Sequence, residues 1–228
     1  DNPPVQAAPV QIMEADSDED QHKPVHPTAL AERLKDGRFT ITVEVAPPRS
    51  FTADSILRAA RRLRAAGANM LNIADTPAAR MKMSAWAVCH LMQTEVGMET
   101  VLHFPTRGRN LLRIQGDLLA AHALGLRNIF VTMGDPTRIG DYPDAMDAYD
   151  IVPSKLIDLL KHHMNAGTDM AGHSIGTPTS FTVGCALNMA ADDPEREIKV
   201  LRKKLESGAD FALGQPVFDP PRLVQFIE

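Results

Sequence analysis

Two acidic residues stand where strands of a sheet are expected to end, and they are the first candidates for chemistry. Glu44 lies within the apolar stretch 41–46, just before two prolines, and Asp135 follows the apolar stretch 128–133. A carboxyl group buried in a sheet has a raised pKa and can carry a proton at neutral pH, as a general acid requires. Glu44 is either such a proton donor or a solvated residue on an alternating strand. Asp135 is either a fixed charge that tunes a bound cofactor or the start of a turn before proline.

Other polar residues lie at comparable positions. His103 stands within the third apolar stretch, where a core histidine is the ordinary interpretation, and no ligand pattern beside it indicates a metal. Arg107 and Arg109 follow that stretch and could bind a phosphate. Gln215 ends the last stretch, and its amide could recognise the donor and acceptor edge of a heterocycle. Lys204 belongs to a run of three basic residues that is typical of a solvated helix face.

The elements that must position these residues alternate along the chain. Four apolar runs begin near residues 41, 70, 100 and 128, at spacings of 29, 30 and 28 residues, and a helical pattern fills each gap. Two more strands are expected at Phe181–Leu187 and Phe211–Gly214. Such alternation predicts parallel strands joined by crossover helices.

The helix ends are also readable. One helix is predicted to begin at Asp193 as N-cap, with Pro194 in its first turn, and to end at Gly208. Gly67 and Gly125 are expected to end two earlier helices. The connection 134–143 after the fourth strand is long and rich in turn formers, and long loops in compact domains are commonly functional. Six units of this kind fit either a doubly wound sheet or most of a (β/α)8 barrel, which places its chemistry on loops after the strands.

Composition and charge exclude several classes of protein. Hydrophobic residues make up 44%, charged residues 23% and aromatic residues 5% of the 228 residues, and no apolar run approaches the roughly 20 residues of a membrane helix. Dinucleotide-binding, P-loop, zinc-protease and nucleophile-elbow motifs are absent. Two cysteines outside any CxxC pair favour a reducing compartment and exclude a cysteine-built zinc site.

The charge separates a leader from the rest. Residues 1–28 carry six acids and one base, whereas the remainder carries 23 of each, so its net charge of zero gives no case for nucleic acid or a membrane surface. We expect residues 1–28 to be a disordered acidic linker and residues 29–228 to be the folded unit. Because the chain begins at Asp, a segment upstream of it is also expected.

Four segments together resemble the methylenetetrahydrofolate reductase family. The closest likeness is to the reductase half of bacterial proteins that fuse it to a homocysteine S-methyltransferase. The matching segments are VEVAPPRS (43–50), RGRNLLRIQGDLLAAHALGLRN (107–128), MGDPTRIGDYPDAMDAYD (133–150) and KKLESGADFALGQPVFD (203–219). The resemblance implies a (β/α)8 TIM-type barrel, truncated after about six β/α units in this chain.

The resemblance also implies an activity. The family binds FAD at the mouth of the barrel and uses NAD(P)H to reduce 5,10-methylenetetrahydrofolate to 5-methyltetrahydrofolate, in one-carbon and methionine metabolism. Nicotinamide first reduces the flavin and leaves, and the folate then takes its place. We expect a cytoplasmic homo-oligomer with an upstream homocysteine S-methyltransferase domain, no nucleic acid and no membrane.

The resemblance assigns roles to particular residues. Glu44 matches the general acid of the E-x-x-P-P-R motif, Asp135 the aspartate close to flavin and folate, and Gln215 the glutamine that hydrogen-bonds the pterin. The residues expected to bind the cofactor are His103, Arg107, Asp135, Tyr149, Glu197 and Lys204, of which Lys204 matches a lysine near the FAD phosphates.

Departures from the family pattern keep two alternatives open. The chain has Pro105-Thr106-Arg107-Gly108 where the fusion proteins tend to have Thr-Cys-Arg-Asp, and Met133 where many reductases have Arg. The stretch 188–191 lacks a histidine that contacts the cofactor in relatives. The alternatives are a folate- or flavin-binding domain without catalysis, attached to a methyltransferase, and a reductase that works without flavin. An unrelated barrel lyase or methyltransferase has no motif of its own here.

Overall fold

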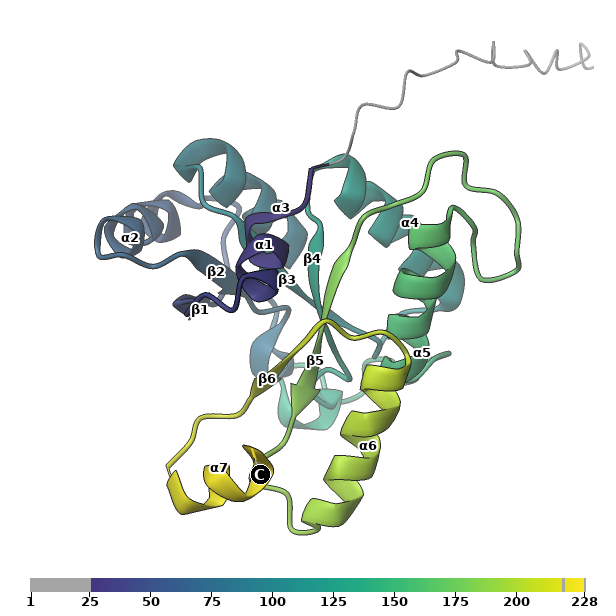
Figure 1. The fold of residues 1–228 in the computed structure, drawn as a ribbon. Helices are drawn as coiled ribbons and strands as arrows, with labels where there is room; N and C mark the ends of the chain where they lie inside the picture. The colour runs from purple at the N-terminus through teal and green to yellow at the C-terminus, as the bar shows by residue number, and fades with distance from the viewer. Residues whose placement is uncertain (1–25, 219, 228) are drawn as a thin grey trace, which may run out of the picture.

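The computed structural model describes residues 26–218 and 220–227 (Figure 1). Most of the expected linker, residues 1–25, lies outside the described residues, and the linker stays a prediction. Thr28 lies within the described part, where its side chain accepts a hydrogen bond from the backbone N–H of Ala31 and caps the first helix.

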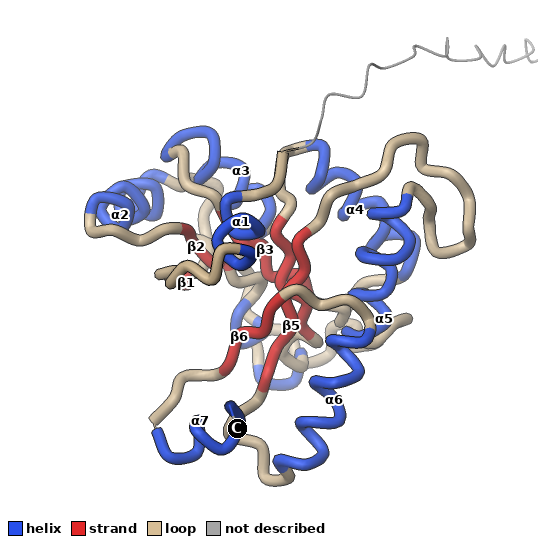
Figure 2. The backbone as a smooth tube through the Cα atoms, in the orientation of Figure 1, coloured by secondary structure: helices blue, strands red, loops and turns tan. Residues whose placement is uncertain are grey.

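Six strands form one parallel sheet in the sequential order β1-β2-β3-β4-β5-β6, as predicted. The sheet curls as it passes from β1 to β6, with the helices that connect the strands on its outer side (Figures 1 and 2). The strands are β1 (Thr42–Val45), β2 (Met70–Ile73), β3 (Thr100–Pro105), β4 (Asn128–Thr132), β5 (Thr182–Leu187) and β6 (Phe211–Gly214).

The helices fall between the strands, as the periodicity predicts. The α-helices are α1 (Ala29–Lys35), α2 (Asp54–Ala65), α3 (Ala85–Leu91), α4 (Leu111–Ala123), α5 (Pro153–Asp158), α6 (Pro194–Glu206) and α7 (Pro220–Ile227). π-Helical turns at Met92–Val96 and Leu159–His163 extend α3 and α5, and short 3-10 turns occupy Pro77–Ala79, Thr137–Ile139 and Met164–Ala166.

The predicted helix ends are confirmed. The Asp193 side chain accepts a hydrogen bond from the backbone N–H of Arg196 and caps α6. Gly67, Gly125 and Gly208 follow α2, α4 and α6 with φ angles of 96°, 77° and 100°, which is left-handed backbone that glycine adopts without a Cβ penalty. Each helix therefore stops where the chain must turn back into the next strand.

Strand order decides between the two folds that six units allow. A doubly wound sheet reverses its strand order at a switch point. This sheet runs from β1 to β6 without reversal, so right-handed crossovers place the connecting helices on one face. The fold is therefore that of six β/α units of a TIM-type barrel, with β1 and β6 as the edges of the described sheet. None of the described helices has the length and apolarity that a membrane span needs.

The main apolar core lies between the outer face of the sheet and the helices that cover it. A smaller cluster lies on the inner face, where Leu30 of α1 packs with Met70, Val101 and Phe130. The Glu99 carboxylate accepts hydrogen bonds of 2.8 Å from the backbone N–H groups of Ala29 and Leu30. Helix α1 is thus held at the amino ends of the strands, and the inner face is left open at their carboxyl ends.

Candidate active site

A cavity of about 410 Å³ opens at the carboxyl ends of the strands. Four of its lining residues, Glu44, His103, Asp135 and Gln215, are residues that the sequence singled out. They come from β1, β3, and the segments that follow β4 and β6. The curl of the sheet therefore brings together side chains that are far apart along the chain, on the edge of the sheet where a barrel of this type places its chemistry.

Glu44 lies on the inner face of β1, but it is exposed. The burial on which a sequence argument for a general acid depends is therefore not present. Glu44 lines the open cavity at the carboxyl ends of the strands, so its carboxyl group is not covered by other described residues. Glu44 can exchange protons with solvent as well as with a bound ligand.

Asp135 connects two loops at the rim of the cavity. Its Oδ2 accepts a hydrogen bond of 2.6 Å from the backbone N–H of Ala78, in the loop after β2. That loop has three non-glycine residues with positive φ, namely Thr76 (42°), Ala78 (55°) and Ala79 (52°). Such backbone is strained for residues with a Cβ and persists only where surrounding contacts hold it. The Asp135 carboxylate is one of those contacts.

Asp75 also lines the cavity, and the sequence analysis missed it. Its Oδ2 lies 2.6 Å from Nη2 of Arg109, whose Nη1 lies 3.0 Å from Oδ2 of Asp117. The Arg109 guanidinium also lies over the ring of Phe104, 4.5 Å from its centroid. Burial raises the pKa of Asp75, and the neighbouring Arg109 opposes that rise. The sequence could have identified Asp75 as a candidate, because this acid follows a predicted strand in the same way as Asp135 does.

Arg109 is therefore committed to two carboxylates rather than to a phosphate. Arg107 is committed as well: its Nη1 lies 3.1 Å from Oδ2 of Asp147, and its Nε donates to the Gly134 carbonyl oxygen at 3.3 Å. Its guanidinium lies 5.9 Å from the ring centroid of Tyr149. Arg107 and Tyr149 thus hold the long loop after β4 against the end of β3 and are not among the cavity-lining residues.

Lys204 and Glu197 lie on α6 beside β5. Lys204 is only 9% exposed, so its assignment to a solvated helix face is wrong. Its long side chain reaches inward, and Nζ donates a hydrogen bond of 2.6 Å to the carbonyl oxygen of Ala186. Glu197 accepts a hydrogen bond of 3.0 Å from the backbone N–H of Asn188. Both side chains brace the end of β5, and neither lines the cavity, although Ala186 does.

His103 presents a neutral ring to the cavity. Burial lowers its pKa from 6.5 to about 4, and its ring packs on Phe130 with a centroid separation of 4.7 Å. Its Nε2 is buried and has no hydrogen-bond partner within residues 26–218 and 220–227. A buried polar atom without a partner is costly, so this nitrogen is available to a ligand.

The lowered pKa of His103 predicts a stability change with pH. The unfolded chain binds the proton near pH 6.5 and the folded chain near pH 4, so the stabilisation is complete above about pH 6.5 and is lost as the pH falls toward 4. The difference between the pKa values of the unfolded and folded states corresponds to about 3 kcal/mol in the free energy of unfolding. Denaturant unfolding at each pH measures the free energy of unfolding. Over this pH range it should fall by about 3 kcal/mol more in the wild type than in His103→Phe, because the other titrating groups are the same in both proteins. Parallel curves for the two proteins would contradict a neutral, buried His103.

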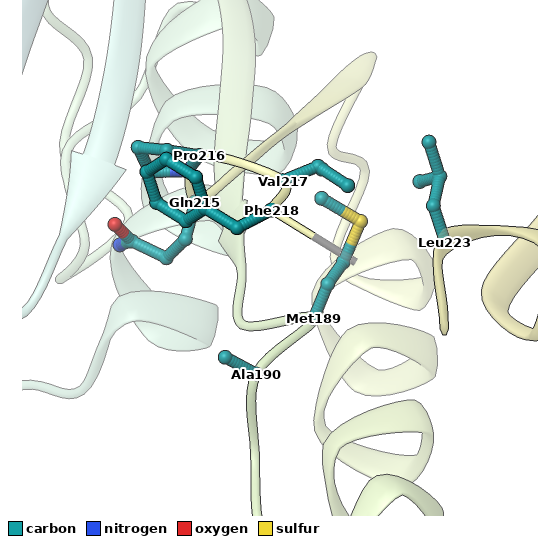
Figure 3. A pocket seen from close by; sticks show the side chains of 7 residues that line it. All are labelled: Met189, Ala190, Gln215, Pro216, Val217, Phe218 and Leu223. Carbon is teal, nitrogen blue, oxygen red and sulfur yellow. The ribbon is translucent and has the colours of Figure 1, made fainter. Parts of the chain in front are cut away.

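A second, apolar cavity adjoins the first and shares Gln215 with it. It is lined by Met189, Ala190, Gln215, Pro216, Val217, Phe218 and Leu223, and has a volume of about 130 Å³. Figure 3 shows the Gln215 amide turned away from Met189 and Leu223, so the polar end of this side chain faces away from the apolar wall. The two cavities together offer a polar end and an apolar end to one ligand. The described residues contain no group of three or more His, Cys, Asp or Glu placed to hold a metal ion.

The sequence model of the family described as methylenetetrahydrofolate reductase matches residues 29–228. The chain is 24% identical over 141 residues to methylenetetrahydrofolate reductase 1 of Schizosaccharomyces pombe, which covers 62% of this chain and 22% of that protein. The chain thus spans about a fifth of the length of that relative.

Two solved structures share the fold. A Clostridium thermocellum protein that binds two copies of 5-methyl-5,6,7,8-tetrahydrofolic acid superposes with a TM-score of 0.56 at 10% identity, over 88% of this chain and 62% of that one. Phosphonopyruvate hydrolase in complex with oxalate and Mg²⁺ superposes with a TM-score of 0.55 at 14% identity, over 87% of this chain and 66% of that one. At such identities these likenesses show the fold alone.

Proposed function

Because the chain belongs to the methylenetetrahydrofolate reductase family, we propose that it reduces 5,10-methylenetetrahydrofolate to 5-methyltetrahydrofolate with NAD(P)H and FAD. The observation that carries the proposal is that Glu44 and Asp135 line one cavity together with Gln215. A proton donor, a fixed negative charge and an amide are the groups that this reduction needs around the folate.

Proton transfer from Glu44 starts the reduction. The methylene carbon of the folate bridges two nitrogens and is a poor hydride acceptor until one C–N bond breaks. Glu44 gives its proton to the departing nitrogen, which leaves a positively charged iminium group on the other nitrogen. Addition of a hydride to the methylene carbon then completes the methyl group. The exposed Glu44 carboxylate regains its proton from water.

The other lining residues bind and orient the folate. The Asp135 carboxylate lies at the rim, where a fixed negative charge stabilises the cationic iminium group. The Gln215 amide can both donate to and accept from the edge of the pterin ring. The apolar cavity beside Gln215 suits the aromatic ring that follows the pterin in a folate.

The residues of the cavity fit the ring end of a flavin. FAD, when bound, accepts a hydride from NAD(P)H and passes it to the folate. The unpartnered Nε2 of His103 offers a hydrogen-bonding group to a heterocycle, and Asp135 lies across the same cavity. Lys204 and Glu197 brace the end of β5 next to Ala186, and we propose that the Lys204 ammonium group holds the phosphate end, with Glu197 near the cofactor.

Anaerobic half-reactions test the proposed function. The FAD-loaded protein that carries this chain should bleach when NADH is added and regain its yellow colour when methylenetetrahydrofolate follows. The product should be 5-methyltetrahydrofolate. Tight folate binding without any oxidation of NADH would instead support the domain without catalysis. Turnover by a colourless protein would support the reductase that works without flavin.

A further inference from the structure

The strand next to Glu44 carries a polar residue that neither the sequence motifs nor the proposed mechanism uses. In the register of β1 and β2, Glu44 pairs with Asn72. Paired residues on adjacent parallel strands point to the same face of a sheet and lie about 4.8 Å apart. Asn72 therefore lies directly beside Glu44 on the inner face. Unlike Glu44, Asn72 is only 7% exposed.

The two polar atoms of the Asn72 amide have different surroundings. Nδ2 donates a hydrogen bond of 3.0 Å to Oγ1 of Thr42, two residues before Glu44 on β1. Oδ1 is buried and has no hydrogen-bond partner in the part of the chain that the structure describes. A buried acceptor without a donor costs free energy, and a fold retains it most readily where a donor is supplied in another state of the protein.

A protonated Glu44 supplies that donor. A carboxylate only accepts hydrogen bonds, whereas a carboxylic acid has one O–H group to donate. Because Thr42 is bonded to the amide nitrogen, the amide oxygen is left for a different partner, and Glu44 is the residue paired with Asn72 along the sheet. An acceptor beside a carboxyl group favours its protonated form.

We propose that Asn72 is a positioning residue for Glu44, with its amide oxygen accepting a hydrogen bond from the protonated Glu44 carboxyl. This inference rests on the proposed function, in which Glu44 must carry a proton when the folate arrives. It gives the cavity-lining Glu44 carboxyl a partner that keeps its proton in place for the folate. No bond is formed or broken by Asn72 itself, and the proton it orients leaves with the folate.

Other groups face Glu44 across the cavity and must be held constant in any test. They are Asp75 after β2, His103 on β3 and Asp135 after β4, whereas Ala186 and Gln215 from β5 and β6 carry no charge. On the loop after β1, Arg49 pairs with Asp141 at 3.3 Å, and behind Asp75 lies Arg109. All of these remain unchanged in variants of Asn72.

The test is the titration of the Glu44 carboxyl in the ligand-free protein, followed by difference infrared spectroscopy. The protonated-carboxyl band of Glu44 is identified by its loss in Glu44→Gln. In Asn72→Leu, which keeps the size but removes the acceptor, the midpoint should move to lower pH by about 0.5 to 1 unit. In Asn72→Asp, a second carboxylate beside Glu44 should move the midpoint to higher pH.

The downward shift in Asn72→Leu carries the proposal, because an apolar neighbour that only removed solvent would move the midpoint to higher pH, and the Asn72→Asp shift shows only that the two positions are close. Asn128→Leu is the matched control: Asn128 is also a buried asparagine with an unpartnered amide oxygen among the described residues, but it lies on β4, away from Glu44. It should leave the midpoint unchanged. If Asn72→Leu does not fold, Asn72→Ala, which also removes the acceptor, takes its place, and a midpoint that does not fall overturns the proposal.

The rate of folate reduction against pH gives the second readout. A general acid is active while protonated, so the alkaline limb of the profile should fall at lower pH in Asn72→Leu and at higher pH in Asn72→Asp. A uniform rate loss with an unmoved limb overturns the proposal while the reductase assignment stands. A wild-type protein without any folate turnover refutes the proposed function, and the infrared titration still decides whether the two side chains interact.

Discussion

Replacement of Glu44 by glutamine should slow the reduction of methylenetetrahydrofolate by about 10²- to 10⁴-fold, the range for loss of a general acid. Reduction of the flavin by NAD(P)H should remain close to the wild-type rate, because that half-reaction needs no proton from the carboxyl. Glutamine keeps the size of the side chain, and Glu44 is exposed, so the fold should tolerate the change. Stopped-flow measurement of each half-reaction separately provides the check.

Two further variants sharpen that experiment. Glu44→Asp retains an acid in a shorter side chain and should recover part of the lost rate. Glu206→Gln replaces another exposed glutamate, on α6 and outside the cavity, and should leave both half-reactions unchanged. An equal loss in the two half-reactions of Glu44→Gln would show that the residue supports binding or folding rather than proton transfer.

Replacement of Arg109 by leucine should lower the free energy of unfolding by about 3 to 5 kcal/mol, the usual cost of breaking a buried ion pair from one side. The side chains of Asp75 and Asp117 are only 9% and 7% exposed, and Arg109 is paired with both. Without the guanidinium, both carboxylates keep their desolvation cost but lose their shared counter-charge. Denaturant unfolding followed by circular dichroism measures the difference.

Arg113 provides the matched control for Arg109. Its Nε lies 2.9 Å from Oδ1 of the same Asp117, but its side chain is 69% exposed. Solvent screens such a pair, and Arg113→Leu should cost less than about 1 kcal/mol. The penalty of Arg109→Leu should also shrink as the pH falls, because burial raises the pKa of Asp75 and protonation removes its charge. A small penalty at neutral pH that does not change with pH would contradict a charged Asp75–Arg109–Asp117 cluster.

The same cluster links stability to the proposed site. Asp75 lines the cavity while its carboxylate is held from behind by Arg109, whose other partner lies on α4. On the other side of the loop after β2, Asp135 binds the backbone N–H of Ala78. The carboxylates of Asp75 and Asp135 therefore stabilise the wall of the cavity, whereas no such contact holds the Glu44 carboxyl group among the described residues. This division agrees with the acid role proposed for Glu44.

Local sequence patterns determined the elements of this protein. Strands and helices were predictable because hydrophobic periodicity and capping residues act over a few neighbours, as at Asp193 and Gly208. The parallel direction of the strands also followed, since crossover helices join them, whereas their order was left open between a doubly wound sheet and a barrel. Acids and amides placed just after strands could be recognised as candidates for the same reason, and Asp75 could have been found in that way.

Tertiary structure alone decided which of these groups meet. The curl of the sheet, which no local pattern encodes, brings Glu44 and Asp135 to one cavity and leaves Glu44 exposed rather than buried. Strand register, set by packing across the whole sheet, places Asn72 beside Glu44. The burial of Lys204 depends on how α6 packs against β5, since a long side chain can turn either to solvent or to a backbone carbonyl. Local propensity depends on residues that are close together in the sequence, whereas these contacts form between residues that are far apart in it.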